Sequence, residues 1–522
     1  MGPDTAAAPE AVRVAGIVLA ALLAAAGILA PGAAARARAM LAALALTPVL
    51  LVVEIWGTPQ LAPVRADPLP YLGGAALVAL LVCAPLARLF ARRPGWLALA
   101  ALAALPFRVP VEAGGATANL LVPLYVVIAA GVLAWAVPRL REAAGRPRPN
   151  GPVEWLLAAA VVLYAVQAAY SSAIDRALEQ TVFFYVPFAL LFVILRDVEW
   201  SRRRLRLGGL ILVGLALAFA AVGYVEYATR TVLFNPKVIA SNQFESYFRV
   251  NSLFFDPNIY GRFLAVVMIG LAAVLLWERR SREVWSAALA LAVLWGGLVL
   301  TLSQSSFAAL LAGLLVLAAL RFPLRKVAPV ALAVAAAGVV LVLAFPSALR
   351  LDLDSAASLD DATSGRYELV TGGLELAERR PLLGWGSGAF RREYRRQASA
   401  SDRAAVSASH TIPLTVAAEQ GVAGLAVYAA LLVAAFARLL RGASRDPWRA
   451  LVAAGFTAVI VHTLLYAAFL EDPMTWTLLA VGTALAWPKQ GLAGRAGAAA
   501  AAAPGGNGVV SGSSAARAPA AQ

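Results

Sequence analysis

Long apolar runs separated by short polar segments fill most of this 522-residue chain. Between residues 11 and 487 the runs come close to the roughly 20 residues that an α-helix needs to cross about 30 Å of hydrocarbon. About 12 to 15 runs qualify, of which those at 95–107 and 474–487 are short enough for half-helices or re-entrant segments. The pattern predicts an all-α protein that crosses a membrane many times.

Arginine clusters in alternate loops indicate the orientation, because short cytoplasmic loops are enriched in basic residues. We therefore expect cytoplasmic positions for the clusters at 36–38, 88–93, 139–148, 202–206, 279–282, 321–326 and 438–449. The intervening loops should face outward, near 56–71, 108–116, 171–180, 229–257, 346–410 and 469–474.

Composition agrees with this picture and excludes several classes of site. The chain is 61% hydrophobic and 14% charged, with a mean hydropathy of +0.77. Its net charge of +15 comes mostly from residues beside membrane ends, where they anchor topology, so we expect no nucleic-acid partner. One cysteine, Cys83, and two histidines rule out an internal disulfide and a Cys- or His-rich metal site.

The chain is expected to have three parts. Residues 1–200 are N-terminal transmembrane helices, 201–487 form a second membrane domain that includes the outward loop 346–410, and 488–522 read as a disordered cytoplasmic tail. There is no nucleotide-binding glycine fingerprint, and no cytoplasmic loop exceeds about 20 residues. Any transferase chemistry must therefore use a donor that is already in the membrane.

The loop 346–410 carries nine Arg and one of the two His. After Ser364, the sequence SGRYELVTGGLELAERR has apolar residues at helical spacing, which predicts an amphipathic helix that Pro381 ends. Gly384 to Gly388 then form a GWGSG turn that can approach a ligand closely, although such turns are usually only turns.

His410 stands just before a predicted helix that Thr411 can cap. The positive end of the helix dipole would favour a neutral imidazole, which can accept a proton. Glu419 is about 13 Å further along a straight helix and should not orient His410. Instead, Gly421 and Gly424 are expected to break the span, and Glu419 to satisfy backbone groups there.

The outward segment YFRVNSLFFDPNIYGRFL, from Tyr247 to Leu264, contains two arginines that the start of a helix does not explain. Asp256 and Pro257 are explained as the start of a helix. Arg249 and Arg262 either snorkel to the interface or bind an anion at the outer surface. His462, inside a later span, is either a functional group or a neutral side chain hydrogen-bonded between helices.

Three blocks together resemble the O-antigen ligase and O-antigen polymerase superfamily over about residues 200–487. They are FRVNSLFFDPN from Phe248, SGR with the later PLLGWGSGAF, and the His-containing block that ends in EQG. The resemblance implies a GT-C-like membrane glycosyltransferase of polysaccharide biosynthesis in the cell envelope. It also implies an undecaprenyl-diphosphate-linked donor and inverting transfer at the outer leaflet, without nucleotide sugar, cofactor or obligatory metal.

The resemblance also assigns roles to residues. Arg249, Arg366 and His410 match the family's two arginines and its histidine, so His410 is the expected base and the arginines are expected to bind the donor diphosphate. Further candidates for the diphosphate are Arg262, Arg391 and Arg392. Two departures are Ser303-Gln304, where relatives tend to have Ser-Arg, and His410-Thr411, where they often have His-Asn.

Three functions remain open. The first is transfer of a glycan to a hydroxyl of a glycan, lipid or protein acceptor, by a multi-pass cell-membrane enzyme whose active site is extracytoplasmic. The second is a transporter or flippase of lipid-linked glycans, which should place charges along a central cavity. The third is a metal-dependent transferase that uses the acidic pairs of the long loop, Asp352 with Asp354 and Asp360 with Asp361.

Overall fold

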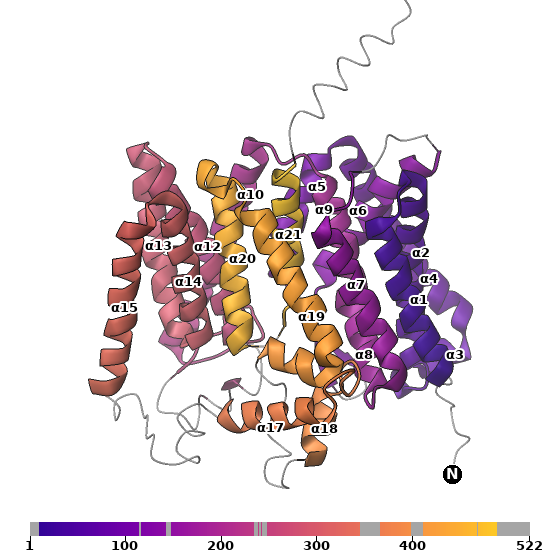
Figure 1. Cartoon of the computed structure of the whole chain (residues 1–522). Coiled ribbons are helices and arrows are strands. Elements are labelled where there is room, and N and C mark those ends of the chain that lie inside the picture. Colours follow the sequence, from indigo (N-terminus) through magenta and orange to yellow (C-terminus); the bar gives the residue numbers. More distant parts are fainter. Residues whose placement is uncertain are drawn as a thin grey trace, which may run out of the picture. The chain divides into compact units, whose positions relative to one another are not determined.

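The structure is a computed structural model of the whole chain (Figure 1). It describes residues 10–487 apart from 114–115, 142–147, 234–237, 240–241, 243–247, 345–365, 398–410 and 467. Residues Met1–Leu485 form one compact unit, and Ala486–Gln522 form a second. The expected tail, 488–522, lies outside the described residues.

The prediction of an all-α membrane protein is confirmed. Twelve helices among the described residues are long and apolar enough to cross a membrane. Two further apolar helices are short, α5 (Pro94–Ala104) and α21 (Pro473–Leu485), at the two places where the sequence indicated short spans.

The first part of the chain contains nine α-helices and one hairpin among the described residues. The helices are α1 (Glu10–Leu29), α2 (Ala33–Ile55), α3 (Ala62–Ala66), α4 (Pro68–Arg92), α5, α6 (Val122–Arg141), α7 (Pro152–Gln167), α8 (Ile174–Gln180) and α9 (Val186–Asp197). A π-helical turn, η3 (Thr181–Tyr185), joins α8 to α9, and 3-10 turns lie at Pro59–Leu61 and Ala168–Tyr170. The antiparallel hairpin of β1 (Val109–Ala113) and β2 (Ala116–Leu120), between α5 and α6, was not predicted.

The second part contributes ten further described helices. They are α10 (Arg202–Thr229), α12 (Pro257–Trp277), α13 (Ser281–Thr301), α14 (Gln304–Arg321), α15 (Leu324–Ala344), α17 (Arg366–Arg379), α18 (Phe390–Gln397), α19 (Ile412–Leu440), α20 (Pro447–Leu465) and α21. A 3-10 turn, η5 (Ala443–Arg445), precedes α20. The predicted amphipathic helix after Ser364 is α17, which ends before Pro381.

Local sequence explains where several of these helices begin. Asp256 accepts a hydrogen bond from the N–H of Asn258 at 2.7 Å, and Pro257 follows it, so the predicted cap of α12 is confirmed. Asp446 caps α20 in the same way. Thr411 holds the N-cap position of α19, but its side chain does not cap the helix, and its hydroxyl donates to the carbonyl of Leu464 at 3.1 Å.

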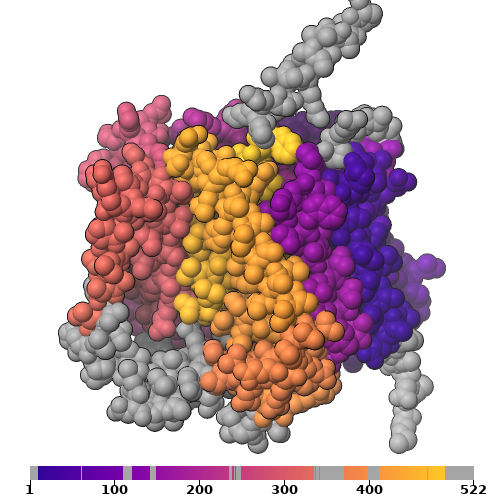
Figure 2. All heavy atoms as spheres, viewed as in Figure 1, coloured from indigo at the N-terminus to yellow at the C-terminus, as the bar shows by residue number. Residues whose placement is uncertain are grey.

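Packing joins the two parts of the compact unit. α9 packs on α21 and α7 packs on α19, while α20 packs on α12 and α14. Figure 2 shows α19 and α20 on one face, with α17 and α18 across the end of α19. Large apolar side chains such as Leu69, Trp285 and Leu332 are more than two thirds exposed, as expected where a helix faces lipid. The division at residue 200 therefore stays a prediction.

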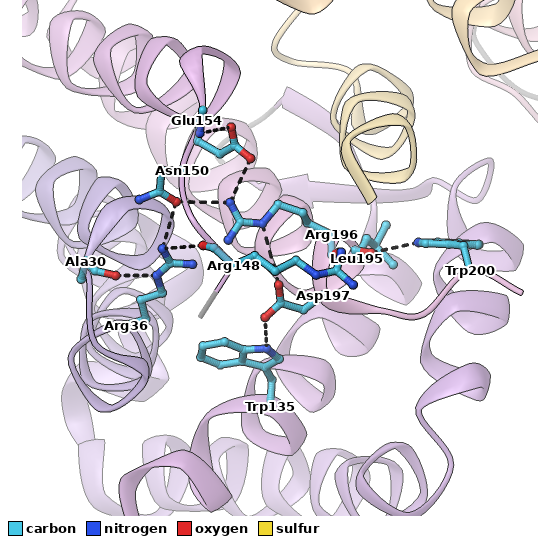
Figure 3. Close-up of polar contacts among 11 residues, drawn as sticks. Ala30, Arg36, Trp135, Arg148, Asn150, Glu154, Leu195, Arg196, Asp197 and Trp200 are labelled. Carbon is cyan, nitrogen blue, oxygen red and sulfur yellow. Dashed lines mark hydrogen bonds and ion pairs between the residues drawn. The ribbon is translucent and has the colours of Figure 1, made fainter. Parts of the chain in front are cut away.

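A buried polar cluster ties together the helix ends that the arginine pattern places on the cytoplasmic side (Figure 3). Arg196 at the end of α9 pairs with Glu154 in the first turn of α7 at 3.1 Å. Arg36 in α2 donates to the carbonyl of Ala30 at 2.6 Å and to Asn150 Oδ1 at 2.9 Å. The segments 30–36, 148–154 and 196–197 thus meet at one end of the helices, which agrees with the predicted orientation.

Candidate functional site

α19 is broken at Gly421, as the sequence predicted. Gly421 has φ 65° and ψ −161°, which no helix contains. The segment from Pro381 through the GWGSG turn enters this break and forms backbone hydrogen bonds with both sides of it. These bonds run from the N–H of Trp385 to the carbonyl of Ala418 (3.0 Å), from Gly386 to Glu419 (2.8 Å) and from Val422 to Pro381 (2.7 Å). We call this arrangement of residues 381–390 and 418–423 the interlock.

The side chain of Glu419 closes the interlock. Its two carboxylate oxygens accept hydrogen bonds from the backbone N–H groups of Gly388, at 2.9 Å, and Phe390, at 3.0 Å. The residue is 7% exposed, so these bonds are made away from water. The prediction that Glu419 satisfies backbone groups is therefore confirmed, and its partners lie about 30 residues earlier in the chain.

The glycines of the turn allow the chain to approach itself closely. Gly386 has φ 93°, and a Cβ atom there would lie 2.4 Å from the Cα of Ser171. A Cβ at Gly421 would lie 2.4 Å from the carbonyl carbon of Leu382. Glycine is thus required by backbone contacts within the protein at both positions.

The interlock also rests on the C-terminal end of α7 and the residues that follow it, in the first part of the chain. Ser387 Oγ donates to the carbonyl of Tyr164 at 2.6 Å, and Ser171 Oγ donates to the carbonyl of Ser387 at 2.8 Å. The hydroxyl of Tyr170 donates to the carbonyl of Leu383 at 2.7 Å. Because Glu154 of the buried cluster lies at the other end of α7, the interlock and that cluster occupy opposite ends of the helix bundle.

A second polar group lies where α12, α14 and α20 meet, around Asn258. Arg249 donates through Nε to the carbonyl of Thr301, at 3.0 Å, and through Nη2 to Asn258 Oδ1, at 3.4 Å. Ser303 Oγ also donates to Asn258 Oδ1, at 2.8 Å. Arg249 is therefore oriented by two helix ends rather than left to reach freely toward the interface.

His462 of α20 belongs to the same group. Its Nε2 lies 3.2 Å from Ser305 Oγ and 3.2 Å from the carbonyl oxygen of Asn258, and its ring is fully buried. The hydrogen-bonded alternative for His462 is thus the one observed. In the sequence, Ser303-Gln304 was noted only because relatives tend to have Ser-Arg there. The contacts of Ser303 and Ser305 in this polar group were therefore not predicted.

Arg262 forms a buried ion pair with Asp472, with side chains that are 2% and 6% exposed. It therefore does not snorkel to the surface. Arg108 lines the same small cavity, of about 20 Å³. Burial lowers the pKa of Arg108, and Asp472 acts in the opposite direction. Two guanidinium groups and one carboxylate thus line this cavity.

The remaining predicted arginines lie on the helices that the interlock anchors. Arg391 and Arg392 are exposed on α18, and Arg392 donates to the backbone carbonyl of Ser172. Arg366 is the first residue of α17, and its side chain, like the whole of His410, lies outside the described residues. The joint binding of one diphosphate by Arg249 and Arg366 therefore stays a prediction.

Comparison with known proteins finds a family match in one part of the chain. Residues 289–429 match the family model described as O-antigen ligase. This part of the chain is similar to the O-antigen ligase family. No curated protein matches the chain.

The O-antigen ligase match runs from within α13 into α19 and contains the complete interlock, together with Arg366 and His410. Arg249, Arg262 and His462 lie outside the matched residues. The family resemblance is thus confirmed over residues 289–429, and the chain is a multi-pass membrane protein.

Proposed function

We propose that this protein transfers a glycan from an undecaprenyl-diphosphate-linked donor to an acceptor hydroxyl at the outer face of the cytoplasmic membrane. The observation that carries the proposal is the O-antigen ligase match over residues 289–429, which includes the interlock. The transfer inverts the anomeric centre and needs no metal ion. Whether the acceptor makes the enzyme a ligase or a polymerase is an outcome of the experiments below.

Positive charge is the main requirement of the donor side. A diphosphate is a weakly basic leaving group, so its departure is helped more by arginine than by a proton donor. Arg249 is oriented through Nε and Nη2, and its Nη1 makes no hydrogen bond to any described residue. It therefore offers donors at a fixed position. Arg366, Arg391 and Arg392 are the proposed contributors from the long loop.

A base is the main requirement of the acceptor side. In the proposed step the acceptor oxygen attacks the anomeric carbon, the bond from that carbon to the diphosphate oxygen breaks, and His410 takes the hydroxyl proton. The electron pair of the broken bond leaves with the polyprenyl diphosphate. In the sequence, His410 stands two residues before Ile412, the first residue of α19, and the interlock holds the break of that helix at Gly421.

Two substitutions test the assignment, His410→Ala and Arg249→Ala. Both variants are expected to insert at wild-type levels and to lose glycan transfer, measured with lipid-linked glycan in membranes. Arg379→Ala is the matched control, because Arg379 is 57% exposed on α17 and its ion pair with Glu375 is at the surface. Full activity of the His410 variant would refute its role as the base.

A further inference from the structure

A second cavity lies between α7, η3, α19 and the loop before α21. Its volume is about 80 Å³, room for about six water-sized spheres and on the order of one sugar ring. Its lining includes Tyr164 of α7, Gln180 of α8, Glu419 and Tyr428 of α19, and Glu471. In Figure 1 α19 stands beside α7, and the helix pair forms one wall.

The polar lining of this cavity is ordered by hydrogen bonds. The hydroxyl of Tyr164 bonds to Gln180 Oε1, and Gln180 Nε2 donates to Glu471 Oε1. Glu471 Oε2 makes no hydrogen bond to any described residue, and the side chain is only partly buried. A carboxylate oxygen held in place and reachable by solvent is a ready acceptor for a ligand hydroxyl.

The charge of this cavity is opposite to that of the cavity with Arg108 and Arg262. Glu419 and Glu471 both line it, and two carboxylates disfavour a phosphate group. Tyrosine rings, an amide and carboxylates instead suit a neutral ligand with many hydroxyls. Glu471 lines this cavity, and the next residue, Asp472, lines the cavity with Arg108 and Arg262. The two cavities therefore lie on either side of this short segment.

We propose that the cavity with Glu471 binds the sugar ring of the acceptor. This inference rests on the proposed function and adds a location to it. Glycosyl transfer breaks the bond between the glycan and an anionic leaving group and joins the glycan to the oxygen of a neutral hydroxyl, and the lining of this cavity suits the neutral partner. Ile412 and Thr415 of the lining are two and five residues beyond the predicted base, His410, in the sequence.

The test is steady-state transfer by the purified full chain in lipid nanodiscs. The probes are lipid-linked glycan as donor and, as acceptors in parallel, a glycolipid with a free sugar hydroxyl and the lipid-linked glycan itself. Glu471→Gln should raise the acceptor KM about tenfold or more, because a neutral amide accepts a weaker hydrogen bond than a carboxylate. The donor KM and the slow hydrolysis of the donor should stay within about twofold of wild type.

Tyr428→Phe is the second variant, since it removes one hydroxyl from the lining and keeps the ring. It should shift the acceptor KM in the same direction. Glu375→Gln on exposed α17 is the matched control and should change nothing. An unchanged acceptor KM in both lining variants, or a raised donor KM, would overturn the inference. Absence of transfer by wild-type protein with either acceptor would instead overturn the proposed function.

Discussion

Removal of the Glu419 carboxylate should open the interlock without unfolding the helix bundle. In Glu419→Ala, the backbone N–H groups of Gly388 and Phe390 keep their buried positions and lose their acceptors. Glu419→Gln is the graded variant, because its amide oxygen can accept from only one of the two N–H groups at full strength.

The magnitude follows from the two bonds. A buried donor left without a partner costs about 1–3 kcal/mol, so two cost about 2–6 kcal/mol in the alanine variant. Since about 1.4 kcal/mol is a factor of ten in an equilibrium constant, local opening should become roughly 30-fold to 10⁴-fold more frequent. The glutamine variant should lose about half of that free energy.

Hydrogen–deuterium exchange with mass spectrometry measures this opening directly. Peptides that cover 384–390 should exchange faster in the alanine variant, less so in the glutamine variant, and no faster in Glu375→Ala, whose side chain is 58% exposed. Peptides of α12 and α14 should keep wild-type protection. Wild-type exchange at 384–390 in Glu419→Ala would show that the carboxylate does not hold the turn, and the account of the interlock would fail.

Three further predictions concern charge. Arg262→Ala leaves Asp472 buried without its partner and should lower the free energy of unfolding by about 3–5 kcal/mol, whereas the double variant with Asp472→Asn should recover part of it in a thermal melt. Burial raises the pKa of Glu471 despite nearby Arg176, so its contribution to stability is full below pH 4.5 and is lost as pH rises through the raised pKa. The melting temperature of the wild type should fall as the pH rises through this pKa, and that of Glu471→Gln should fall less. An equal fall in the two proteins would contradict the raised pKa of Glu471. Transfer should persist in excess EDTA, while loss reversed by Mg²⁺ would favour the metal-dependent alternative.

The sequence predicts the helices of this protein well and its long-range contacts poorly. Spans follow from local hydropathy, and the starts of α12 and α20 follow from Asp-Pro pairs. The break at Gly421 is also local, because glycine tolerates the required φ. The hairpin of β1 and β2 was missed although its strands, VPVEA and ATANL, alternate apolar and polar residues around a Gly-Gly pair, which is a local hairpin signal.

The partners of the site residues depend on how the helices pack, which no local pattern encodes. His462 and Asn258 are 204 residues apart, and Gln180 and Glu471 are 291 apart. Arg262 was recognised as unusual from its place near a helix start, but its pairing with Asp472 follows only from the packing of α12 near α21. The sequence therefore identified the polar residues in unusual positions but did not predict the residues that they contact.

The most direct test of the central claim is product analysis with purified protein in nanodiscs and lipid-linked glycan. The account predicts that every glycan transferred releases one undecaprenyl diphosphate and gains an inverted anomeric bond, and that Arg249→Ala abolishes both. Movement of intact lipid-linked glycan across the bilayer without release of the diphosphate would contradict it and identify the protein as a transporter.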